Sequence, residues 1–265
     1  MPVLTTRTKT LPTKEAIRLT NLWQKYGPNT YPLDIAELID GAFRDSGFDG
    51  QLTTKRGCFD SFEGCLVRTK DSQNWTILLN DMVENKRRQR FTHAHELGHF
   101  MCHRGLRDRF EDSDASLNDF RDNIESEANL FASWLLMPAN IIRDEFSGSR
   151  WDAATLCQVG CRFECSLQAS ALRLVSLSSK PIAFVVSRDG IILWACKSAS
   201  APYMAAYCFG DELPETSLAL VAHREGSGSL EAEDSGDAWN NFFHAKESQY
   251  FDTSGRGYQY TCIEF

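Results

Sequence analysis

At 265 residues the chain is longer than one average domain, and its 42% apolar and 24% charged residues exclude a disordered protein. The net charge of −8 is concentrated in residues 181–265, which contain twelve Asp and Glu and five Lys and Arg. This excess of negative charge argues against binding of nucleic-acid phosphates by this part of the chain. The sequence has no apolar run of about 18 residues and no apolar N-terminal stretch, and its nine scattered cysteines do not suggest a disulfide framework. We therefore expect a cytoplasmic protein of two units.

The first part of the chain predicts two short helices, a small sheet and a longer helix. Apolar residues recur at helical spacing in residues 14–26 and again in residues 32–43. Three short stretches separated by Gly, Asp and Ser are then typical of strands in a small antiparallel sheet. The strands are expected at 52–60, 64–70 and 74–80, and the longer helix at about 84–102.

The second part of the chain begins with a polar, acidic stretch at 105–123. A strongly patterned helix follows at 124–137, and residues 139–178 are predicted to be helical as well. From residue 181 onward, short alternating runs predict strands, with Arg-Asp-Gly at 188–190 as a hairpin turn. The whole pattern predicts an α+β chain whose best domain boundary lies where the helical region ends.

The predicted helix at 84–102 contains the motif HELGH, from His95 to His99. Residues four apart on a helix share one face, so both imidazoles can bind a single Zn²⁺. Glu96 points about 100° away from His95, where it can act as a general base on a water that the metal activates. The alternative is an amphipathic helix with two exposed histidines, but the apolar residues around this motif argue against that alternative.

A catalytic zinc keeps one position for water, so one more protein ligand is wanted. The helix at 124–137 offers Glu125 and Glu127, and its apolar residues indicate that it is buried, where an unpaired carboxylate would be costly. Asn129 follows Glu125 by one turn and could hydrogen-bond a ligand histidine. In the motif, the small Gly98 allows another segment to approach the helix closely.

The two stretches RFTHAHELGHFMCH and ESEANLFASWLLMP together resemble the ImmA/IrrE family of zinc-dependent endopeptidases, and the resemblance extends over about residues 14–175. It implies a gluzincin-like enzyme with His95 and His99 as zinc ligands, Glu96 as catalytic base and a glutamate of ESEAN as third ligand. Glu125 is preferred because zincins with a glutamate ligand tend to place it four residues before Asp or Asn. Glu127 is the fallback, and Mn²⁺ is the alternative metal.

Two further histidines of the motif helix are not expected to bind metal. The family usually has an aliphatic residue at the position of His93, which lies on nearly the opposite helix face from His95 and is expected to pack in the core. His103 continues the four-residue spacing from His99, but no base follows His99, which argues against a second metal pair. Three cysteines at 157, 161 and 165 lack the CxxC element of common clusters and are expected to be packed thiols.

The resemblance also implies a domain organisation and a partner. We expect a zincin-like metallopeptidase domain at 1–140, a helical, helix-turn-helix-like segment at 141–180, and a small α/β or β-rich sensor-like domain at 181–265. Some relatives have a GAF-type domain in this last position. Members of the family typically cleave a helix-turn-helix (XRE-type) repressor, which releases stress-response or mobile-element genes. Direct nucleic-acid binding by the helical segment is not expected, because it carries few cations.

Two other functions stay open on the sequence alone. The first is a module of the same fold that binds a regulator without cutting it, as in a toxin–antitoxin pair. The second is a metallopeptidase of broad specificity. An intact HELGH favours an enzyme, because a pure binder would not need the base Glu96.

Overall fold

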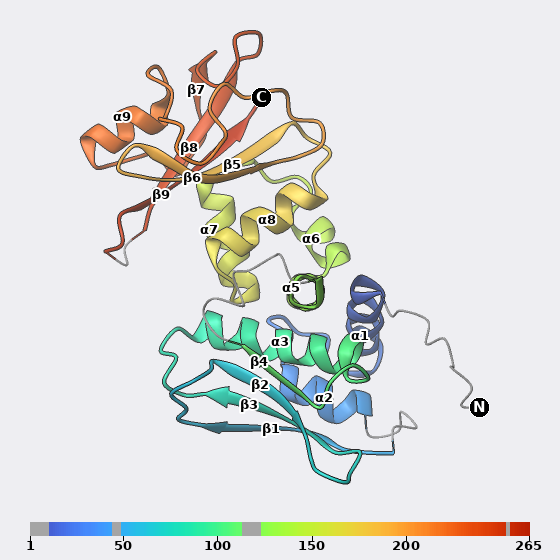
Figure 1. Ribbon diagram of the computed structural model, residues 1–265. Helices are drawn as coiled ribbons and strands as arrows, with labels where there is room; N and C mark the ends of the chain where they lie inside the picture. The colour runs from blue at the N-terminus through green and yellow to red at the C-terminus, as the bar shows by residue number, and fades with distance from the viewer. Residues whose placement is uncertain (1–10, 44–48, 113–122, 253–254) are drawn as a thin grey trace, which may run out of the picture. The chain divides into compact units, whose positions relative to one another are not determined.

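The computed structural model describes residues 11–43, 49–112, 123–252 and 255–265 (Figure 1). Contacts divide the chain into two compact units, residues 1–142 with 163–165 and residues 143–162 with 166–265. Helices and two small sheets occur together, which confirms the predicted α+β class. The division into 1–140, 141–180 and 181–265 stays a prediction.

The first unit combines a four-stranded sheet with helices that pack on it and on each other (Figure 1). Its strand order is β1-β3-β2-β4, and β2 runs antiparallel to both β3 and β4. The elements are α1 (Pro12–Tyr26), α2 (Ile35–Phe43), β1 (Leu52–Gly57), β2 (Gly64–Arg68), β3 (Trp75–Asn80), α3 (Lys86–His103), β4 (Arg109–Asp112) and α5 (Asn123–Leu136), and α6 (Ala139–Phe146) follows.

Two details of this sheet differ from the expected small antiparallel sheet. Strand β1 pairs with β3 in parallel. After β1 the chain crosses to β2, and β3 then runs back between β1 and β2, antiparallel to β2. Strand β4 lies within the stretch expected to be merely polar and acidic, and Phe110 is its buried residue. Residues 113–122 of that stretch lie outside the described residues.

Helix α3 is buried on most of its circumference, because the sheet covers one side and α5 another. Trp75 of β3 meets Phe100 of α3 edge to face, with ring centroids 6.1 Å apart. The Asn85 side chain caps the helix by accepting a hydrogen bond from the backbone N–H of Arg88. A helix enclosed on several sides holds its side chains in fixed orientations.

The close approach of α5 to α3 depends on Gly98. A Cβ atom at this position would lie 3.0 Å from Cδ1 of Phe131 and 3.2 Å from the carbonyl oxygen of Ala128. The prediction that Gly98 admits a neighbouring segment is therefore confirmed. Since Gly98 lies between His95 and His99, the segment it admits comes to rest beside both histidines.

The second unit is built on a five-stranded antiparallel sheet with the order β6-β5-β9-β8-β7 (Figure 1). The predicted hairpin turn is present between β5 and β6, where Asp189 and Gly190 both have positive φ, of 53° and 77°. The elements of this unit are α7 (Ala153–Phe163), α8 (Leu167–Leu177), β5 (Ile182–Arg188), β6 (Ile191–Lys197), α9 (Leu218–Glu225), β7 (Glu233–Gly236), β8 (Ala245–Phe251) and β9 (Tyr258–Glu264).

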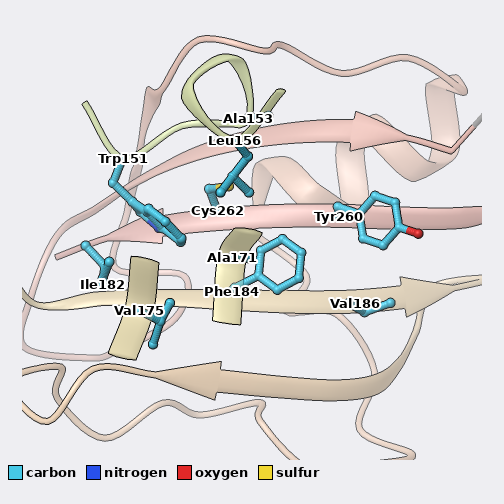
Figure 2. Packing of buried hydrophobic residues seen from close by; sticks show 10 residues of the cluster. All are labelled: Trp151, Ala153, Leu156, Ala171, Val175, Ile182, Phe184, Val186, Tyr260 and Cys262. Carbon is cyan, nitrogen blue, oxygen red and sulfur yellow. The ribbon is translucent and has the colours of Figure 1, made fainter. Parts of the chain in front are cut away.

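The helical pair α7 and α8 contributes to the core of this second unit. Figure 2 shows Ala171 and Val175 of α8 gathered with Phe184 of β5 and Tyr260 of β9. Trp151 joins the same cluster, and its indole N–H donates to the carbonyl oxygen of Ala183 at 2.9 Å. The turn and second helix expected after α7 are present, and the face that α8 turns to the sheet is occupied by core packing.

The carboxylate of Glu247 is fully buried in the second unit, at the N-terminus of α9. It accepts hydrogen bonds from the backbone N–H groups of Leu218, at 3.2 Å, and Ala219, at 2.9 Å. Burial raises the pKa of Glu247 above its ordinary value of 4.5, although these hydrogen bonds act in the opposite direction. The folded protein therefore binds a proton here more tightly than the unfolded chain.

Replacing this carboxyl should change how stability depends on pH. As pH rises above 4.5, the wild-type chain loses stability at Glu247, because the unfolded state gives up the proton first. The Glu247→Gln variant should lack this loss, so its free energy of unfolding should fall less with pH than that of the wild type. Urea unfolding over a pH series measures both slopes, with Glu233→Gln, an exposed site, as the control. Equal slopes for all three proteins would contradict the assignment.

Candidate metal centre

Two histidines of the HELGH motif lie side by side on α3. His95 and His99 are both fully buried, and their Nε2 atoms lie 2.9 Å apart. Both rings are therefore directed to one point, as expected for residues one turn apart on the same helix face.

Helix α5 brings a carboxylate to the same point. The Oε2 atom of Glu125 lies 3.2 Å from Nε2 of His95 and 3.2 Å from Nε2 of His99. Within the described residues, these three side chains are the group whose ligand atoms converge closely enough to hold a metal ion. Glu127, the fallback, is directed to His103 instead. The structure thus favours Glu125, and its role as third ligand is our proposal.

Asn129 lies one turn beyond Glu125 and contacts the other nitrogen of His95. The ring Nδ1–H of His95 donates to Oδ1 of Asn129 at 2.8 Å. Because an amide oxygen only accepts, the proton of the neutral ring is on Nδ1, and Nε2 carries a lone pair. Asn129 therefore orients His95 with its lone pair toward Glu125 and His99.

The geometry and chemistry of this group fit a divalent metal ion. A tetrahedral zinc with bonds of about 2.0–2.1 Å separates neighbouring ligand atoms by about 3.3 Å, and the separations here are 2.9 and 3.2 Å. The His95 lone pair and the Glu125 carboxylate both offer electron pairs to the same point, and a cation there removes their repulsion. Two imidazoles and one carboxylate are donors that zinc accepts.

The charge of Glu125 also suits a metal ligand. Burial acts to raise the pKa of its carboxyl. In the metal-free chain a proton on Nε2 of His95 or His99 takes the place of the cation, and the resulting hydrogen bond outweighs burial and holds the pKa well below its ordinary value. The side chain is thus a carboxylate at neutral pH.

Glu96, the predicted base, is fully buried beside His95 on α3 and lies against strand β2. A Cβ atom at Gly64 of β2 would lie 2.6 Å from Oε1 of Glu96 and 2.4 Å from Cγ2 of Thr92. Only a glycine leaves room for the base at this position. The position of Gly64 in the sequence, far from HELGH, gave no sign of this contact.

Adding one methyl group at Gly64 should disturb both the fold and the base. The Gly64→Ala variant should lower the free energy of unfolding by about 1–3 kcal/mol, because Thr92 or the strand must move. The control is Gly41→Ala on α2, where an added Cβ meets nothing within 4 Å, and where alanine should raise stability by about 0.5–1 kcal/mol. Denaturant unfolding distinguishes the two signs, and an unchanged Gly64→Ala protein would contradict the close approach.

The structure places His93 away from the metal group, as expected. Its Nε2 atom lies 3.0 Å from the hydroxyl of Thr54, and only 8% of the residue is exposed. Burial, together with the charge of nearby Arg56, lowers the pKa of His93 to about 4, so the ring is neutral at physiological pH. His93 is a core histidine here.

Two neighbours of His99 were not predicted as part of the site. Nδ1 of His99 lies 3.0 Å from Nδ1 of His103, whose Nε2 lies 3.1 Å from Oε2 of Glu127. The ring of Phe110 on β4 stacks on that of His99, with centroids 4.7 Å apart. The four-residue spacing of His95, His99 and His103 was the signal for the first contact, whereas no pattern pointed to Phe110.

Residues 59–175 match the family model Peptidase_M78, described as the IrrE N-terminal-like domain. A solved structure of a Mycobacterium tuberculosis transcriptional regulator is similar at 15% identity, covering 94% of this chain and 86% of that chain, with a TM-score of 0.52. This likeness supports the fold alone. The comparison with curated proteins gave no match.

Among the described residues, no helix combines the length and apolar character needed to cross a bilayer. The matched segment contains HELGH, the α5 helix and the converging group, so the resemblance inferred from the two motifs is confirmed. Residues 59–175 therefore carry the match to the Peptidase_M78 family model and form a zincin-like, IrrE N-terminal-like domain.

Proposed function

We propose that the protein is a zinc-dependent endopeptidase that cleaves a helix-turn-helix repressor in the cytoplasm and so releases stress-response or mobile-element genes. The observation that carries the proposal is the convergence of His95, His99 and Glu125 beside the buried carboxylate of Glu96. The family match supports a metallopeptidase-like, IrrE-type function. Repressor cleavage itself is the finer step that we add.

Each residue of the group has a distinct part in the proposed reaction. A zinc or manganese ion held by His95, His99 and Glu125 would supply Lewis acidity toward a peptide carbonyl and a water molecule. Glu96 accepts a proton from the attacking water at its carboxylate and passes it to the nitrogen of the leaving amine, so that one amide bond breaks as one C–O bond forms. Asn129 keeps the His95 ring oriented throughout.

The sheet offers a surface for an extended peptide close to this group. In the described part of the chain, β4 ends the four-stranded sheet and pairs on one side, with β2. Phe110 of β4 stacks on His99, so a polypeptide that added to this edge would pass near the metal ligands. This supports a polypeptide substrate rather than a small molecule.

Direct DNA binding by the α7–α8 pair is not supported by its cations. Arg162 forms a two-point ion pair with Glu145, at 2.7 and 2.8 Å, and Arg173 is 2% exposed. Neither guanidinium is presented for phosphate contacts, which dominate affinity for DNA. We therefore propose that regulation proceeds through a protein partner.

Co-expression with the helix-turn-helix regulator encoded nearest to this chain tests the proposal. The regulator should be cut in the presence of the wild-type protein and stay full length with Glu96→Gln. If it stays full length with both and co-purifies with them, the protein is a non-cleaving binding module. An unrelated denatured protein is the specificity control, and its degradation at the same rate would indicate a broad-specificity peptidase.

A further inference from the structure

A hydrogen-bonded chain of three side chains leads away from the metal group. Nδ1 of His99 lies 3.0 Å from Nδ1 of His103, and Nε2 of His103 lies 3.1 Å from Oε2 of Glu127. His99 is fully buried, and the side chains of His103 and Glu127 are 3% and 15% exposed. Helix α3 supplies both histidines and α5 supplies the carboxylate.

The positions of the protons along this chain follow from its carboxylate end. Glu127 accepts, so the ring proton of neutral His103 is on Nε2 and is donated to Oε2. Nδ1 of His103 then carries a lone pair and accepts from Nδ1–H of His99. As a result, Nε2 of His99 carries a lone pair directed toward Nε2 of His95 and Oε2 of Glu125.

We propose that His103 and Glu127 are positioning residues that hold His99 in its metal-binding tautomer and orientation. The inference rests on the proposed metal centre and adds to it the residues that tune one ligand. Ligand histidines in metal sites usually donate their second ring nitrogen to a carboxylate, a carbonyl or a water, and this contact makes the ring a stronger ligand. Here an imidazole transmits the effect of the carboxylate over one additional side chain.

The two ligand histidines are thereby supported in different ways. His95 donates to the neutral amide of Asn129, whereas His99 is connected through His103 to the charged Glu127. A polar pair as buried as His103 and Glu127 adds little to stability compared with apolar residues of the same volume. A role in holding His99 explains why the pair of His103 and Glu127 lies directly beside this ligand.

Variants at His103 separate positioning from packing. His103→Leu removes the acceptor for His99, whereas His103→Asn has nearly the same shape as leucine and can place an oxygen near the former Nδ1. Zinc affinity, measured by competition with a chromophoric chelator, should fall about 10- to 100-fold in His103→Leu and be partly restored in His103→Asn. The visible spectrum of the Co²⁺-loaded protein should change in His103→Leu and resemble the wild type in His103→Asn.

The matched control is His93→Leu, which removes another buried histidine of α3 that contacts Thr54 rather than a ligand. It should leave zinc affinity and the Co²⁺ spectrum unchanged. Glu127→Gln, which keeps an acceptor oxygen and removes the charge, should weaken zinc binding by a smaller factor than His103→Leu. If His103→Leu does not fold, the comparison of His103→Asn and Glu127→Gln with the wild type decides.

The outcomes also distinguish this inference from the proposed function. If the wild type binds one zinc and the folded His103 and Glu127 variants bind it equally tightly, the positioning role is overturned and the metal centre remains. An equal loss of affinity in His93→Leu and His103→Leu would overturn it as well, since the effect would then be one of packing. A wild-type protein that binds no zinc would instead contradict the metal centre itself.

Discussion

Glu96→Gln should lower the turnover number for repressor cleavage by about 10²- to 10⁴-fold, the range usual for loss of a general acid–base residue. The amide has nearly the shape of the carboxylate but cannot accept a proton from water. Because Glu96 is outside the group of His95, His99 and Glu125, the zinc content should remain that of the wild type. Single-turnover cleavage of the purified regulator and metal analysis of the same preparations measure both effects.

Retention of metal and of thermal stability is the control that makes this result specific. A Glu96→Gln protein that keeps its zinc and cleaves at the wild-type rate would show that Glu96 is not the base. A variant that loses zinc as well as activity would show that the glutamate acts on the metal site instead.

Glu125→Gln should abolish stoichiometric zinc binding, while Glu127→Gln should still bind one zinc per chain with reduced affinity. The two glutamates are two residues apart on α5, but Glu125 contacts both ligand nitrogens and Glu127 contacts His103. An amide in place of Glu125 removes the negative charge that compensates the metal. Metal titration of the two variants under one set of conditions measures the difference.

This pair of variants also tests the choice between the two candidate ligands. The reverse result, in which Glu127→Gln loses zinc and Glu125→Gln retains it, would make Glu127 the third ligand. Equal retention in both would contradict a carboxylate ligand from α5.

The sequence was most informative where spacing along one helix determines geometry. His95 and His99 share a face because they are four residues apart, and Asn129 follows Glu125 by the same step. The structure adds that α5 lies against α3 at Gly98, which brings both pairs together. A small residue indicates that something can approach, but the sequence does not say which segment does.

Residue spacing did not predict contacts between elements that are distant in the chain. Phe110 belongs to a polar, acidic stretch, and its stacking on His99 depends on the pairing of β4 with β2. The parallel pairing of β1 and β3 has the same origin, since the direction of pairing depends on how the chain crosses between the two strands, which the strand pattern does not give. His103 had the spacing of a metal ligand. In the structure it contacts the ligand His99 instead, because its other ring nitrogen is held by Glu127.

The measurement that tests the account most directly is the zinc content of the purified protein after loading and removal of excess metal. We expect one zinc per chain in the wild type and none in His95→Ala, because the structure brings three ligand atoms together around one point. A wild-type chain without stoichiometric zinc, or a His95→Ala chain that retains it, would contradict the metal centre on which the proposed function depends.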